Sequence, residues 1–141
     1  MTPTNALENA SPAIVAAFAA PGVVLVHSQA DPAHPDFEVS REVIGVLKGQ
    51  TDARGRTLEI VEVPAPTALA DDDGWVDHSY INHYLCNGGV VLCAFDDPHD
   101  ELAAGIFRRL FPRRTVTLVD ARTIFAGGGG IHCITQQQPR I

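Results

Sequence analysis

A cysteine that follows a run of glycines is the feature of this sequence most able to do chemistry. Residues 127–139 read GGGGIHCITQQQP, so Cys133 stands three positions after the last glycine. Glycine permits positive φ and lets other groups approach the backbone closely. Backbone N–H groups beside a thiol can stabilise negative charge, and the thiolate is the nucleophilic form. The pattern indicates a reactive cysteine; the alternative is a small buried apolar side chain, as many free cysteines are.

The histidine next to this cysteine is expected to play a supporting role. If the tail is a strand, His132 and Cys133 point to opposite faces, and His132 cannot act as the direct base. Use of the glycines as a phosphate loop is disfavoured, because no Lys and Ser or Thr pair directly follows them.

Other candidate residues favour structural roles. A metal site could use His78 and His83 with the acidic run 71–73, but the spacing fits neither a zinc pattern nor a calcium loop. We therefore expect a solvated acidic loop at Asp71, Asp72 and Asp73, and no metal. Cys86 and Cys93 lie in an apolar hairpin and are expected in the core.

The elements that must position the thiol alternate between strands and helices. Turn chemistry predicts a hairpin at Asn87-Gly88 with positive φ at both residues, a short helix beginning at Ser11-Pro12, and a long loop over 64–79. Apolar periodicity predicts strands at 22–28, 56–64, 79–85, 90–95 and 115–120, and helices at 37–49, 97–112 and 121–126. The fold class is α/β, with a strand–helix–strand unit repeated over 22–63 and 80–120.

Composition limits the partners of this chain. Its 141 residues suit one domain, and its net charge of -7 argues against nucleic acid and anionic membranes. No apolar run approaches the roughly 20 residues that a membrane-spanning helix needs. Three cysteines without a C-x-x-C pair indicate free thiols in a reducing cytoplasm.

The tail GGGGIHCITQQQP resembles the C-terminal signature of agmatine deiminases and the related bacterial-type peptidylarginine deiminases. Four upstream segments resemble the same family in the same order: PGVVLVH, TDARGRTLEIVEVPAP, SYINHYLCNGGVVLCAFDDPHDELA and LFPRRTVTLVDARTIFAGGGG. The resemblance covers residues 18–141 and is closer to agmatine deiminase. Residues 1–17 are left as a divergent, Ala-rich N-terminal segment.

This resemblance implies a fold and a reaction. The family fold is a pentein-type fivefold α/β propeller, so the chain would supply about two β-β-α-β units of an incomplete barrel. The family cysteine that matches Cys133 attacks the guanidinium carbon of the substrate, ammonia leaves, and water releases a ureido product. For agmatine that product is N-carbamoylputrescine, in putrescine biosynthesis. The backbone of Gly128, Gly129 and Gly130 would line the pocket for a small guanidino substrate, and no cofactor is implied.

The resemblance ends where the family places its histidine acid/base and a carboxylate. Counting back from Phe18 without a gap, Ser11 stands at the histidine position and Ala13 at the carboxylate position. Loss of general acid–base help typically costs about 10²–10⁴-fold in rate. We therefore expect little or no deiminase activity from this chain alone.

Three interpretations follow for the chain as a whole. It is a truncated or split deiminase-family hydrolase whose missing N-terminal half lies on a separate chain, a non-catalytic remnant, or an unrelated α/β binding module. The tail favours the first. Two propeller units alone would expose strand edges and apolar flanks, which predicts a homo-oligomer unless a partner chain covers them.

Overall fold

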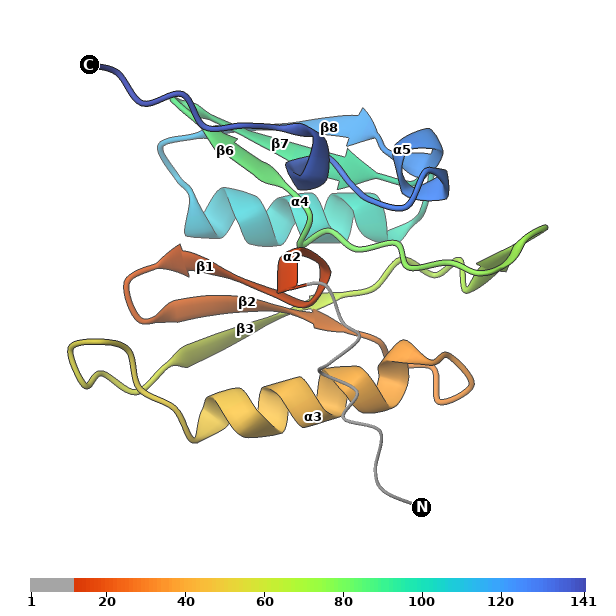
Figure 1. Cartoon of the computed structure of the whole chain (residues 1–141), viewed down its shortest axis with the longest axis horizontal. Coiled ribbons are helices and arrows are strands. Elements are labelled where there is room, and N and C mark those ends of the chain that lie inside the picture. Colours follow the sequence, from red (N-terminus) through yellow and green to blue (C-terminus); the bar gives the residue numbers. More distant parts are fainter. Residues whose placement is uncertain (1–11) are drawn as a thin grey trace.

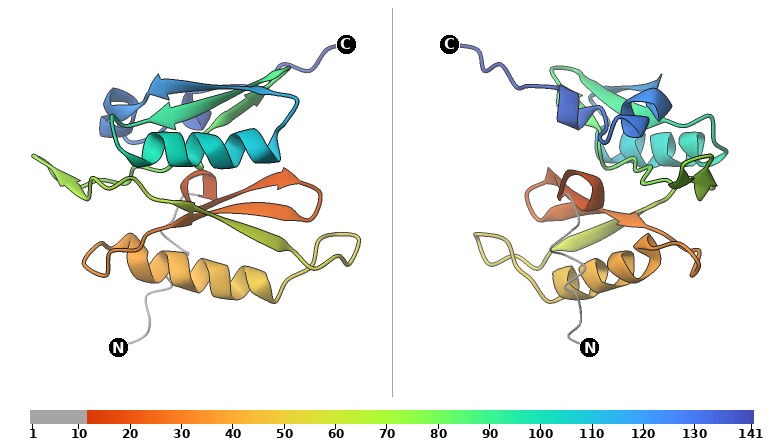
Figure 2. Two further views of the ribbon diagram at one scale, coloured as in Figure 1. Left: turned by 180° about the vertical axis from the view of Figure 1, so that it is seen from behind. Right: turned by 45° about the vertical axis from the view of Figure 1, so that its right-hand side comes forward.

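The computed structural model describes residues 12–141. These residues contain two three-stranded sheets, each with its own helix (Figures 1 and 2). The first unit follows a short helix, α2 (Pro12–Val15), and has the sheet order β1-β2-β3. β1 pairs with β2 antiparallel, and β2 pairs with β3 parallel. Its elements are β1 (Ala16–Ala20), β2 (Val23–Ser28), α3 (Asp36–Lys48) and β3 (Glu59–Pro64).

The second unit repeats the first. Its sheet has the order β6-β7-β8, again with one antiparallel and one parallel pairing. Its elements are β6 (Tyr84–Cys86), β7 (Gly89–Ala94), α4 (His99–Leu110) and β8 (Thr115–Asp120). The connection between the units carries a two-strand ribbon, β4 (Ala70–Asp71) and β5 (Gly74–Trp75), and the tail adds α5 (Arg122–Ala126) and a 3₁₀ turn, η1 (His132–Ile134). The expected pair of β-β-α-β units is therefore present.

The two units share one apolar core. α4 lies between the two sheets, and α3 covers the outer face of the first sheet (Figure 1). Alternate residues of a strand point to opposite faces. Accordingly, Leu25 packs in the cluster that contains Phe107 of α4, whereas Val24 and Val26 pack with Val43 of α3. β2 is thus buried on both faces, which explains its continuous apolar sequence.

Several predicted elements are confirmed, including the strands at β2, β7 and β8 and all three longer helical segments. The strand β1 was not predicted. Its sequence, AAFAA, has little β-branched or aromatic character, and its strand geometry comes from pairing with β2. The cap predicted at Ser11 lies outside the described residues.

Two strands are shorter than predicted, and one turn differs. β3 begins at Glu59, and β6 begins only at Tyr84, because Ser79–His83 form a buried turn in which the Ser79 hydroxyl accepts a bond from the Ile81 N–H. In the hairpin turn only Gly88 has positive φ, at 71°, so the prediction for Asn87 was wrong. Within residues 12–141 the longest helix has 13 residues, and no helix is long and apolar enough to cross a bilayer.

Candidate functional site

Cys133 lies exposed on the 3₁₀ turn η1, so the condition that the tail is a strand is not met here. The turn is closed by main-chain bonds, including one from the Cys133 N–H to the Gly130 carbonyl at 3.2 Å. Because the thiol is exposed, it is not the small buried apolar side chain of the alternative interpretation. Cys93 is the buried thiol, as expected, and burial raises its pKa to about 11, while Cys86 is only half-buried.

A buried asparagine connects η1 to the turn that precedes β6. Asn82 is 0% exposed, its Nδ2 donates to Cys133 Sγ at 3.1 Å, and its Oδ1 accepts from the His132 N–H at 2.7 Å. A main-chain N–H can only donate, so Oδ1 must face it and Nδ2 must face the sulfur. Sequence reasoning missed this residue; the signal available was an amide side chain inside the apolar run SYINHYL.

Two positions of the glycine run, Gly128 and Gly130, disfavour any larger residue. Gly128 has a φ of 97°, a left-handed conformation that other residues adopt only with strain. A Cβ on Gly130 would lie 2.5 Å from Asn82 Cγ and 2.7 Å from Phe125 Cε2. The chain must therefore lack a side chain at Gly130 for the Asn82 amide to reach the turn. A contact of Gly128, Gly129 or Gly130 with substrate stays a prediction.

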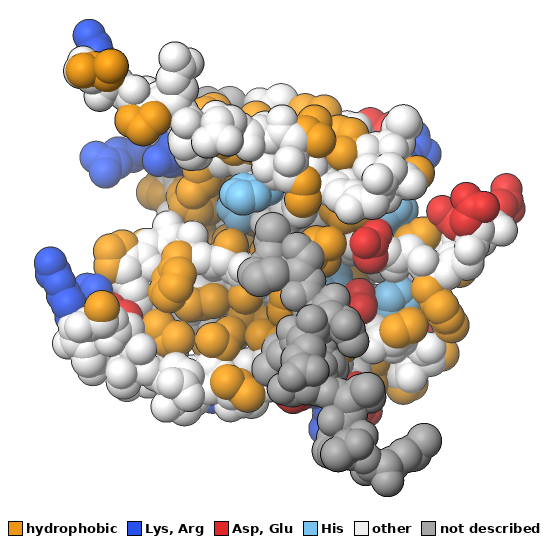
Figure 3. Space-filling model, in the orientation of Figure 1, with side chains coloured by type: hydrophobic (Ala, Val, Ile, Leu, Met, Phe, Trp, Pro, Cys, Tyr) orange, Lys and Arg blue, Asp and Glu red, His pale blue; other side chains and the backbone are white. Residues whose placement is uncertain are grey.

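A largely apolar hollow of about 380 Å³ lies beside the turn, between the two units. β1 contributes Ala16, Ala17 and Phe18 to its lining, and the other lining residues are Ile81, His83, Leu85, His132 and Gln137. Apolar side chains gather over β1 and β2 on the face that Figure 3 presents. The hollow borders His132 rather than Cys133 itself, so it is a space next to the thiol.

Neither histidine near the hollow forms a hydrogen bond with the thiol. His83 is buried, burial lowers its pKa to about 4, and its Nδ1 has no hydrogen-bond partner among the described residues. His132 is exposed, and it is its main-chain N–H that bonds Asn82. Within residues 12–141, no histidine ring or carboxylate hydrogen-bonds to Cys133 Sγ, whose side-chain partner is Asn82.

The residues considered for a metal site do not form a cluster of ligands among residues 12–141. Asp71, Asp72 and Asp73 are exposed at the β4–β5 ribbon, while the His78 ring stacks on Phe95 with centroids 4.4 Å apart. The His83 ring packs edge-on against another aromatic ring, that of Phe107, at 4.6 Å. Across the described span, no three His, Cys, Asp or Glu side chains are grouped to hold a metal ion.

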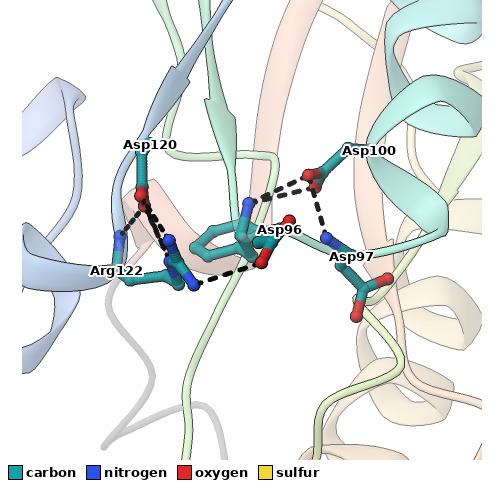
Figure 4. Close-up of polar contacts among 6 residues, drawn as sticks. Asp96, Asp97, Asp100, Asp120 and Arg122 are labelled. Atoms are coloured by element: carbon teal, nitrogen blue, oxygen red, sulfur yellow. Dashed lines mark hydrogen bonds and ion pairs between the residues drawn. The ribbon is translucent and has the colours of Figure 1, made fainter.

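Carboxylates at the carboxyl ends of β7 and β8 form a local network (Figure 4). Asp100 accepts bonds from the N–H groups of Phe95 and Asp97, and it also accepts the Tyr80 hydroxyl at 2.7 Å. Arg122 pairs with Asp120 at 2.7 Å and with Asp96 at 3.5 Å. The bonds that the Arg122 side chain and main-chain N–H donate to Asp120 lower the pKa of that carboxyl to about 2. These carboxylates therefore bind the chain's own groups.

Residues 13–139 match the family of Porphyromonas-type peptidyl-arginine deiminases. A Streptomyces avermitilis protein provisionally named agmatine deiminase is 79% identical over 90% of this chain and 37% of its own length. The agmatine deiminase of Pseudomonas fluorescens is 35% identical over 86% of this chain and 38% of its own.

A solved structure shows the same arrangement of elements. The agmatine deiminase of Enterococcus faecalis superposes with a TM-score of 0.88 at 29% identity, over 94% of this chain and 41% of that one. The chain thus spans well under half the length of the relatives that it matches.

Proposed function

The chain belongs to the family of Porphyromonas-type peptidyl-arginine deiminases, and from this premise we propose that Cys133 is the nucleophile of a guanidine-hydrolysing site. The observation that carries the proposal is an exposed thiol that accepts a hydrogen bond from a fully buried amide, on a turn that directly follows the glycine run. A nucleophilic cysteine needs access to substrate together with a setting that favours its thiolate. Exposure gives Cys133 access to substrate, and the Asn82 amide supplies a hydrogen-bond donor to its sulfur.

The proposed reaction proceeds through a covalent intermediate. The Cys133 thiolate forms a bond to the guanidinium carbon, and the resulting adduct expels one terminal nitrogen as ammonia. The S-bound amidino group then adds water, the C–S bond breaks, and a ureido product leaves. With agmatine the balance is agmatine plus water giving N-carbamoylputrescine plus ammonia. The leaving nitrogen must gain a proton, and the attacking water must lose one proton as it adds and a second as the C–S bond breaks and the carbonyl forms.

Among residues 12–141, no side chain that could transfer a proton is hydrogen-bonded to Cys133. We propose that the proton-transfer groups come from β-β-α-β units beyond the two described, in a pentein-type ring of which this chain forms one wall. Support comes from the share of each relative that is matched, 37% to 41%, and from the Sγ environment, in which a neutral amide is the side-chain donor. A neutral amide can bond to a thiolate but cannot shuttle a proton. The chain alone is therefore expected to be weakly active or inactive.

The test is complementation. The purified chain is incubated with agmatine, alone or with a polypeptide that carries the remaining N-terminal part of the Streptomyces avermitilis relative, and ammonia and ureido product are measured. We expect turnover only in the mixture, and we expect Cys133→Ala to abolish it while Cys86→Ala retains it. Turnover by the chain alone at the rate of an intact relative would contradict the proposed division of the site. Activity that survives Cys133→Ala would contradict the nucleophile.

A second copy of the chain is the other partner that we propose. Phe18, on the edge strand β1, is 62% exposed and lines the hollow beside the turn. Exposed apolar side chains on an unpaired strand edge promote association. A homo-oligomer would cover this surface if no complementary chain does.

A further inference from the structure

We propose that Asn82 is a positioning residue for the nucleophile: it fixes the 3₁₀ turn with one end of its amide and holds the Cys133 sulfur with the other. The inference rests on the proposed role of Cys133. It assigns to Asn82 no proton transfer, because a carboxamide does not titrate in the range where enzymes work.

Both ends of the Asn82 side chain are occupied. The 2.7 Å bond from the His132 N–H to Oδ1 ties the turn to the hairpin, and the 3.1 Å bond from Nδ2 reaches Sγ. The main chain of Asn82 is held as well, since its carbonyl accepts from the Cys93 thiol at 3.1 Å. Asn82 is 0% exposed and so has no water with which to exchange these bonds. Its orientation is therefore set before any substrate arrives.

The bond to sulfur has a chemical consequence. Cys133 is exposed, so its side chain would otherwise be free to change rotamer. A donor aimed at Sγ restrains that rotamer and fixes the direction of the sulfur lone pairs, and the amide N–H can bond to the thiolate that reacts. Loss of the Asn82 donor is thus expected to slow reactions of the Cys133 thiolate.

Two substitutions separate the two ends of the amide. Asn82→Asp keeps the shape and the Oδ1 acceptor for the His132 N–H but places an oxygen where Nδ2 faces the sulfur. Asn82→Leu has similar volume and removes both bonds. Asn87→Asp is the matched control, because it makes the same change at an exposed amide in the turn between β6 and β7, while the side-chain partner of Cys133 is Asn82.

The experiment measures alkylation of each thiol by iodoacetamide in the full chain at neutral pH. Trypsin places Cys133 in peptide 123–140 and both other cysteines in peptide 57–108, so mass spectrometry reads them separately. We expect Asn82→Asp and Asn82→Leu to slow alkylation of Cys133 by about tenfold or more, with peptide 57–108 as protected as in the native chain. Asn87→Asp should leave the Cys133 rate within about twofold of native.

Alkylation of Cys133 at the native rate in a folded Asn82→Asp chain would overturn the proposal. Rapid alkylation of peptide 57–108 would instead report unfolding, and a second measurement then decides. In a Cys133→Ala chain that keeps Asn82, the ¹H–¹⁵N resonances of the Asn82 side-chain amide should shift relative to the native chain. The resonances of the exposed Asn87 side-chain amide should not move. An unmoved Asn82 amide would refute the bond. Neither readout depends on deiminase turnover, so failure here is distinguishable from failure of the complementation test.

Discussion

Gly130→Ala is the substitution for which the geometry makes the sharpest prediction. The added Cβ would lie 2.5 Å from both Cγ and Oδ1 of Asn82. Separations below 3.0 Å are essentially never found for real Cβ atoms. The opposing side chain is fully buried and cannot swing into water, and Phe125 closes the other side at 2.7 Å. The backbone, the amide or the ring must therefore move.

The cost can be estimated from its parts. Overpacking a well-packed site costs about 1–3 kcal/mol. A displaced Asn82 also loses its bonds to His132 and Cys133, and each lost hydrogen bond costs about 1 kcal/mol. Reduced freedom of the unfolded chain returns about 0.4–1 kcal/mol, because alanine replaces glycine. The net expectation is a loss of about 3 kcal/mol in the free energy of unfolding.

Urea unfolding followed by circular dichroism measures this loss, and Gly105→Ala is the matched control. Gly105 lies within α4, has no neighbouring atom within 4 Å of an added Cβ, and has no positive φ. Alanine there should stabilise the chain by about 0.5–1 kcal/mol through helix propensity. Gly130→Ala should also slow alkylation of Cys133, since it displaces the Asn82 amide. If Gly130→Ala were as stable as the native chain, the proposed contact between the glycine run and Asn82 would be wrong.

Three further perturbations test other parts of the molecule. His83→Phe should flatten the pH dependence of stability. In the native fold the pKa of His83 is about 4, below the ordinary value of 6.5, so between these values the unfolded chain binds a proton that the folded chain does not. The free energy of unfolding of the native chain should therefore fall by up to about 3 kcal/mol as the pH drops from 6.5 to 4. A denaturation series from pH 7 to pH 4 measures this, and parallel native and variant curves would contradict it. Phe18→Ser should reduce the apparent mass in light scattering if the chain self-associates through β1; a native chain that is monomeric would already rule out that interface. Asp100→Ala should lower the free energy of unfolding by about 2–3 kcal/mol, because it leaves the Phe95 N–H and the Tyr80 hydroxyl without their acceptor; a loss below about 1 kcal/mol would show that water replaces the carboxylate.

Much of the secondary structure could be predicted from local sequence patterns. The apolar run of β2, the helical spacing of α3 and α4, and the Asn87-Gly88 turn each report a preference of their own segment. β1 could not be predicted, because its sequence AAFAA lacks β-branched residues and it becomes a strand only by pairing with β2. The turn at Ser79–His83 was misread for a related reason: its alternating letters resemble a strand, but side-chain bonds from Ser79 and Asn82 hold it in another shape.

For the site, the sequence by itself determined the nucleophile candidate and its glycines, because a thiol beside a glycine run is a local pattern and one that resembles a known family. Only the tertiary structure decided that Cys133 is exposed on a 3₁₀ turn and that Asn82 is its partner. The partners stand 51 positions apart in the chain, so no local periodicity could pair them. At Gly130 both contribute: the sequence shows that the residue is glycine, and the tertiary structure shows why, because the Asn82 amide packs where a Cβ would lie.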